Sequence, residues 1–108
     1  MLKKLYRLSN VEKRIGKTID SPFFKLKLIK SGESNPKFAF VISKKIDKRA
    51  VYRNRIKRSL AKIVARILLD IKPGHNFIFV VKKEILGKQQ KDLEKIVKDV
   101  FIKQNLLR

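Results

Sequence analysis

The chain has 108 residues, the size of one domain, and 44% hydrophobic residues with seven Phe and two Tyr favour a folded core over a disordered polycation. It has no cysteine, which excludes disulfides, cysteine-bound zinc, iron–sulfur clusters and thiol chemistry. The net charge of +20 at pH 7 predicts a polyanionic partner, and a nucleic acid is favoured over an anionic membrane surface.

The N-terminal residues are basic and lack the unbroken apolar run of a signal peptide. The longest apolar runs, FAFVI and FIFVV, have about five residues each, whereas a helix needs ~20 to cross a bilayer. We therefore expect a cytoplasmic protein that makes no membrane contact, with a single domain over residues 1–108.

The first elements expected along the chain are a short helix and a short strand. Residues 8–15 have the composition of a helix, with Ser9 or Asn10 as its N-cap and Gly16 at its end. Residues 17–20, KTID, form either a short strand or part of a loop.

The next two elements are strands. In FFKLKLIK, residues 23–30, side chains alternate, which predicts a strand with one face in the core and one face in water. The wet face carries Phe23, Lys25 and Lys27. A loop with turn chemistry follows, and residues 37–43 then predict a more buried strand.

A long amphipathic helix, a strand and a second helix follow. Within residues 50–71 apolar side chains recur every three or four positions, at Tyr52, Ile56, Leu60, Ile63, Ile67 and Ile71. Pro73 and Gly74 stop this helix, and residues 77–81 predict a short buried strand. A second amphipathic helix begins after Gly87 and ends near residue 104.

The expected order of elements is therefore α-β-β-β-α-β-α, or one strand fewer if KTID is a loop. Because the last strand follows a long helix, we expect a β-α-β unit within a mixed sheet. The predicted fold class is a single-domain α+β sandwich.

The long helix and the segment before it carry the densest charge. Between Lys44 and Lys62 there are nine basic residues and one acid, Asp47. At 100° per residue, the side of the helix opposite the apolar stripe carries Arg55, Arg58, Lys62 and Arg66. A helix face of mixed sign is usually only a solvated face, but here the cations lack counter-charges and add no stability. Those at the N-terminus of the helix also oppose its dipole. This pattern therefore favours a polyanion as the partner.

The same stretch, FAFVISKKIDKRAVYRNRIKRSL, resembles the signature of the bacterial ribonuclease P protein subunit. The resemblance is densest over residues 37–63. It implies the α-β-β-β-α-β-α fold with a left-handed β-α-β crossover. It also implies two partners, a catalytic RNA and precursor tRNA, and no obligate protein partner is evident. The assembled enzyme removes 5′ leaders with Mg²⁺ held by the RNA, and the protein alone binds no metal.

The resemblance and the charge pattern together give a set of candidate RNA-binding residues. They are Lys44, Lys45, Lys48, Arg49, Arg53, Asn54, Arg55, Lys57, Arg58 and Lys62. One departure is Ala61, where members of the family usually have Arg, and it is open whether Lys62 replaces that residue. Arginine suits this role because its planar fork binds phosphate in a bidentate manner.

The leader of the precursor is the second expected ligand. The first helix usually carries aromatic residues that line the leader groove, but residues 8–15 contain none. Phe23, Lys25 and Lys27 are the remaining candidates, with Phe23 stacking on an unpaired base and the lysines following the backbone. The alternative for Phe23 is that it packs beneath the first helix.

The sequence gives no catalytic or metal-binding residue of its own. Its nine acids are scattered, and its only histidine, His75, follows Pro73 and Gly74 in a turn. We therefore expect a non-catalytic subunit of an RNA enzyme. Two alternatives are a basic ribosomal or other structured-RNA-binding protein without a processing role, and a protein-only nuclease.

Overall fold

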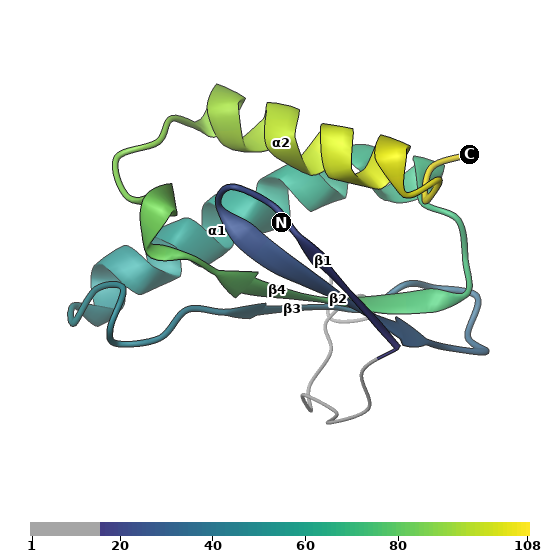
Figure 1. Cartoon of the computed structure of the whole chain (residues 1–108), viewed down its shortest axis with the longest axis horizontal. Coiled ribbons are helices and arrows are strands. Elements are labelled where there is room, and N and C mark those ends of the chain that lie inside the picture. Colours follow the sequence, from purple (N-terminus) through teal and green to yellow (C-terminus); the bar gives the residue numbers. More distant parts are fainter. Residues whose placement is uncertain (1–15) are drawn as a thin grey trace.

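The computed structural model describes residues 16–108, so the helix predicted at residues 8–15 lies outside the described part. The elements are the strands β1 (Lys17–Asp20), β2 (Phe24–Lys30), β3 (Phe38–Val41) and β4 (His75–Val81), the helices α1 (Ala50–Ile67) and α2 (Gln90–Lys103), and the 3-10 helices η2 (Leu68–Asp70) and η3 (Lys83–Ile85). Both long helices cover one face of the sheet (Figure 1). Within residues 16–108, no helix has the length and hydropathy required to span a bilayer.

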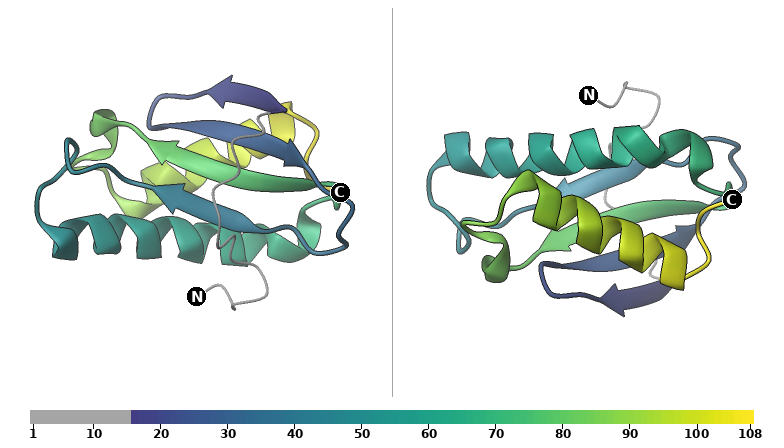
Figure 2. Two further views of the ribbon diagram at one scale, coloured as in Figure 1. Left: turned by 90° about the horizontal axis from the view of Figure 1, so that it is seen from below. Right: turned by 90° about the horizontal axis from the view of Figure 1, so that it is seen from above.

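The strands form one mixed sheet in the order β1-β2-β4-β3 (Figure 2). β2 is antiparallel to both β1 and β4, while β3 and β4 are parallel and are joined through α1. This topology confirms the predicted α+β fold with a β-α-β unit, and it makes KTID a strand. The left-handed sense of the crossover stays a prediction from the family resemblance.

The alternating pattern of β2 places Phe24, Leu26 and Leu28 toward the helices. Phe24 and Leu26 are buried there, and the Phe24 ring lies 5.0 Å from the ring of Phe79 on β4. Phe77 on β4 contacts Phe101 on α2, with 5.2 Å between the ring centroids. The helices are thus fixed to the sheet by a continuous aromatic core.

The long helix ends earlier than its apolar pattern predicted. α1 stops at Ile67 and continues as η2, because Ile71 is extended and forms a bridge with Leu107. Val64, absent from the predicted stripe, is fully buried. Tyr52 is only half-buried, since the first turns of α1 lie beside the η3 segment and border an open pocket there.

Strand β4 begins at His75, two residues before the predicted start at residue 77. The extension follows from pairing, because Lys30 and Ile29 of β2 lie opposite His75 and Asn76. Pairing with the seven residues of β2 thus extends β4 beyond its own apolar run, FIFVV.

Candidate nucleic-acid interface

The segment between β3 and α1 presents its lysines to solvent around one half-buried side chain, that of Ile46. The Ile46 amide donates to the Ser43 carbonyl at 3.1 Å, and the Ile46 side chain packs against the core. Lys44, Lys45 and Lys48 are exposed on either side of this turn. A half-buried isoleucine therefore holds a loop whose lysines are exposed.

Asp47, the one acid in the basic block, holds Arg49 in place. Its carboxylate accepts hydrogen bonds from the Arg49 amide at 2.9 Å and from Arg49 Nε at 3.2 Å. The hydrogen bonds from the Arg49 side chain and amide lower the pKa of Asp47, and the Asp47 carboxylate raises the pKa of Arg49. The Arg49 guanidinium also lies 3.8 Å from the centroid of the Tyr52 ring. Arg49 is thus oriented, and part of its donor capacity is used within the protein.

Arg53 has a structural role that the sequence reasoning did not find. Its Nη1 atom donates to the backbone carbonyls of Asp47 and Lys48, both at 2.9 Å. Because the side chain folds back from the first turns of α1 onto the preceding loop, it fixes the direction in which the loop enters the helix. The residue is half-buried, since its position in the helix puts it beside the apolar stripe rather than opposite it.

A ridge of cations runs along the solvent side of α1. Arg55, Arg58 and Lys62 are exposed, as their spacing predicted. The ridge ends at Arg66, which pairs with Glu94 of α2 at 3.3 Å. The Arg55 guanidinium lies 5.1 Å from the centroid of the Tyr52 ring, so the start of the ridge is braced by an aromatic side chain.

We call the ten predicted RNA-binding residues together the basic surface. Its members are Lys44, Lys45, Lys48, Arg49, Arg53, Asn54, Arg55, Lys57, Arg58 and Lys62. The structure brings them all onto one loop and one helix, and all except half-buried Arg53 are exposed. In the described part of the chain, Arg49 is the one member that forms a salt bridge with an acid. The same residues 16–108 hold no cluster of three His, Cys, Asp or Glu placed to bind a metal ion.

The three predicted leader-binding residues do not share one face. Lys25 and Lys27 pair with Val80 and Ile78 of β4 and alternate along β2 with core residues, so they lie on the face of the sheet away from α1 and α2. Phe23 precedes the strand and packs partly against the core, with the Lys88 ammonium 5.6 Å from its ring centroid. Because β2 begins at Phe24, Phe23 lies outside the strand and the alternation of side chains does not extend to it.

The comparison with known families identifies this arrangement. The profile of the family described as Ribonuclease P matches residues 2–105. The chain belongs to the Ribonuclease P family. The residues matched by the family profile include all of the basic surface and nearly all of the described residues 16–108.

Individual members of the family are similar over parts of the chain. The ribonuclease P protein component of Synechococcus sp. (strain JA-2-3B'a(2-13)) is 34% identical over 67 residues, which are 62% of this chain and 50% of that protein. The component of Clostridioides difficile (strain 630) is 29% identical over 87 residues, covering 79% of this chain and 75% of that protein. The chain thus spans about half the length of the Synechococcus relative.

Solved structures show the same fold. The RNase P protein of Staphylococcus aureus superposes with a TM-score of 0.84 at 19% identity, covering 97% of this chain and 100% of that chain. The RNase P protein of Thermotoga maritima gives a TM-score of 0.73 at 19% identity, covering 79% and 80%. At these identities the likeness concerns the arrangement of elements alone.

The departure at Ala61 has a geometric consequence. Ala61 packs partly against the core, while Lys62 is exposed on the ridge. Neighbouring residues of a helix point about 100° apart, so Lys62 projects from a different side than position 61. Lys62 therefore extends the ridge of Arg55 and Arg58 and projects from a different side of α1 than Ala61.

Proposed function

We propose that this protein is the protein subunit of a bacterial ribonuclease P, which binds the catalytic RNA and the 5′ leader of precursor tRNA. The basic surface carries the proposal, because its exposed cations lie on the loop and helix that hold the signature of the family. In the assembled enzyme the leader is removed to give the mature 5′ end of tRNA. We assign the cutting to the RNA and its bound Mg²⁺, and the compartment to the cytoplasm.

The ridge supports this role through its length and sign. From Arg55 to Lys62 the helix rises about 10 Å, a distance over which one nucleic-acid strand presents about three phosphates. Arg58 in the middle contributes a planar fork that binds phosphate with two parallel hydrogen bonds. A rigid helix holds these groups at fixed spacing, which suits a folded RNA better than a flexible tail would.

For the leader we propose Lys25 and Lys27 as contacts to its backbone, because both lie on the sheet face that the two long helices leave uncovered. The packing of Phe23 against the core and beside Lys88 favours its structural role over base stacking. The leader and the catalytic RNA would then use different faces of the protein.

Reconstitution tests the proposal. Adding the full chain to the RNase P RNA of its own organism at low Mg²⁺ should restore 5′ maturation of a labelled precursor tRNA. The RNA alone at high Mg²⁺ shows that the RNA is competent, and the protein without RNA tests for a protein-only nuclease. An RNA that cleaves at high Mg²⁺ but gains nothing from the protein would contradict the assignment.

A matched pair of variants links the result to the basic surface. Arg55→Ala/Arg58→Ala removes two cations of the ridge and should abolish most of the gain. Lys91→Ala/Lys95→Ala removes the same charge from exposed positions of α2 and should leave the gain intact. The alternative, a binder of ribosomal or other structured RNA, predicts equal affinity for ribosomal RNA and RNase P RNA in direct competition.

A further inference from the structure

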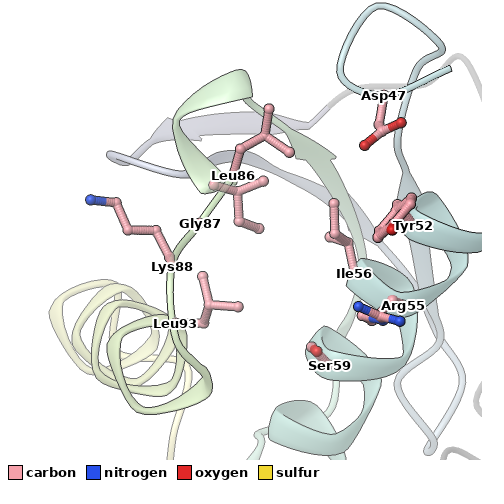
Figure 3. Close-up of a pocket in the computed structure, with 10 residues that line it drawn as sticks. Asp47, Tyr52, Arg55, Ile56, Ser59, Leu86, Gly87, Lys88 and Leu93 are labelled. Atoms are coloured by element: carbon pink, nitrogen blue, oxygen red, sulfur yellow. The ribbon is translucent and has the colours of Figure 1, made fainter. Parts of the chain in front are cut away.

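A pocket of about 200 Å³ opens beside the basic surface, between the start of α1 and the segment that links η3 to α2 (Figure 3). Tyr52, Arg55, Ile56 and Ser59 form its α1 side. They recur at helical spacing, which places them on one side of the helix. Across the pocket stand Ile85, Leu86, Gly87, Lys88 and Leu93.

The inner surface of this pocket is apolar, although its surroundings are strongly basic. Ile85 and Leu93 are buried in the core, and Ile56 packs partly against it. Leu86 remains 40% exposed, so an aliphatic wall faces the opening. Lys88 contributes its stem, since its ammonium points away from α1 toward Phe23. A ligand therefore meets apolar walls inside and the cations of α1 outside.

Gly87 shapes the rim of the pocket. Its φ of +78° lies in the left-handed region, which side chains other than glycine rarely adopt. Apart from Leu86, Gly87 and Lys88 themselves, no described residue has a heavy atom within 4 Å of the position that a Cβ of Gly87 would take. A bare peptide group therefore borders open space at the mouth, where a flat ring can approach it closely.

We propose that this pocket binds one unstacked nucleobase of the RNA that the basic surface holds. The inference rests on the proposed function and adds a base-binding site to the phosphate-binding surface. Size favours a single ring system, because an aliphatic cavity of about 150 Å³ accommodates benzene, whereas sites for drug-sized ligands start near 300 Å³. The position of the pocket favours RNA over an acidic peptide, because Arg55 is both a pocket residue and part of the ridge that we propose binds RNA phosphates.

Two polar groups give the pocket a preference among bases. The Asp47 side chain, only 14% exposed, lines the pocket next to Tyr52, and the Ser59 hydroxyl lines its α1 side. Arg49 donates from its amide and Nε to Asp47 Oδ1 and from Nη2 to Oδ2, which leaves Oδ2 one further lone pair. This lone pair can accept a hydrogen bond from an exocyclic amino group, which adenine, cytosine and guanine carry and uracil does not. We therefore assign the pocket to a base with an exocyclic amino group.

The first experiment measures RNA affinity for a variant that fills the pocket. Ser59→Phe places an aromatic ring where the base would lie, and Ser34→Phe makes the same change in the exposed loop between β2 and β3. Ser59→Phe should weaken binding to RNase P RNA about tenfold, the order of one lost base-stacking contact. Ser34→Phe should bind as the unaltered protein does.

The salt dependence separates this site from the basic surface. Ser59→Phe removes no phosphate contact, so its slope of log affinity against log salt should equal that of the unaltered protein. Arg58→Ala should lower that slope by about one. If Ser59→Phe binds normally while Arg58→Ala binds more weakly, the pocket proposal is overturned and the proposed function stands. If neither variant changes RNA affinity, the pocket proposal and the proposed function are both overturned.

The second experiment does not depend on the tolerance of Ser59 to a large side chain. The amides of the full, isotope-labelled chain are followed by NMR as AMP, CMP, GMP and UMP are added separately. The amides of Ser59, Gly87 and Leu93 should shift with the three amino-bearing nucleotides and less with UMP. Shifts confined to Arg58 and Lys62, or equal for all four, would show phosphate binding alone and reject the base site.

Discussion

Arg53 and Arg55 stand two positions apart in the same motif, but their guanidinium groups have different surroundings. Arg53 donates two hydrogen bonds of 2.9 Å to the carbonyls of Asp47 and Lys48. Arg55 is exposed and touches the Tyr52 ring without a salt bridge in the described part of the chain. One arginine therefore organises the loop, and the other is available to phosphate.

This difference predicts distinct effects of the two alanine substitutions. Arg55→Ala should lower RNA affinity severalfold and leave the thermal midpoint unchanged, because an exposed cation adds little to stability. Arg53→Ala should lower both, at a cost of about 1 kcal/mol of unfolding free energy for a half-buried charge-assisted pair of hydrogen bonds. Thermal unfolding and RNA binding, measured on both variants, check this. Equal melting curves for the two would contradict the role assigned to Arg53.

The carboxyl groups of Asp47 and Asp20 predict a dependence on pH. Hydrogen bonds from Arg49 and from Lys82, respectively, lower their pKa values below 3.8. A lowered folded-state pKa adds stability above the unfolded value, and this stability is lost as the pH falls through the folded value. Carboxyl NMR titration should therefore show both midpoints below 3.8.

A matched substitution identifies the cause of the Asp47 shift. Arg49→Ala removes the guanidinium that donates to the carboxylate and should return the Asp47 midpoint toward 3.8, while the Asp20 midpoint stays low because Lys82 is untouched. A midpoint for Asp47 that is insensitive to Arg49→Ala would show that the loop backbone, rather than the guanidinium, holds the carboxylate.

At the scale of elements, the period of the hydrophobic pattern predicted the phase of α1 because burial of the helix decides its orientation. Leu60, Ile63 and Ile67 are buried, and the cations opposite them are exposed. The end of α1 was missed because the bridge between Ile71 and Leu107 joins residues far apart in sequence. The amphipathic pattern carries no information on such a contact.

The pocket was not predicted because its residues, too, are far apart in the sequence. Ser59 and Gly87 are neighbours only because α1 and the η3 segment pack side by side. Arg53 escaped prediction because its partners are backbone carbonyls, and these leave no trace in side-chain composition. Phe23 shows the limit of strict alternation at the end of a strand, where tertiary packing decides the direction of a side chain.

Burial of α1 predicts a large stability effect at its centre. Leu60 is 1% exposed in the core between α1 and the sheet. Leu60→Ala should lower the free energy of unfolding by about 2–5 kcal/mol, from lost apolar burial and the cavity left behind. Lys62→Ala, two positions on and exposed, serves as the control and should change stability by less than about 0.5 kcal/mol. Denaturant unfolding measures both, and similar midpoints would show that the helix phase is wrong.

At the scale of the whole molecule, the charge is excessive for stability alone. The net charge is +20, and residues 1–70 carry 20 basic and 5 acidic side chains, against 9 and 4 in residues 71–108. Self-repulsion of this size opposes the compact state, and a bound polyanion relieves it. The excess of positive charge therefore destabilises the free protein and is neutralised only in the complex with a polyanion.

The same surplus predicts how RNA binding responds to salt. Each phosphate neutralised by a lysine or arginine releases condensed counterions, so log affinity falls linearly with log salt, at a slope set by the number of contacts. With six or more contacts from the basic surface, affinity for RNase P RNA should fall roughly a thousandfold between 50 and 200 mM salt. Filter binding or fluorescence anisotropy over this range measures the slope.

Matched variants locate the contacts. Lys91→Ala/Lys95→Ala should keep the full slope, and Arg55→Ala/Arg58→Ala should lower it by about two if the contacts lie on α1. A flat profile for the unaltered protein would rule out the electrostatic account, since this many exposed cations on one loop and helix cannot bind RNA without displacing its counterions.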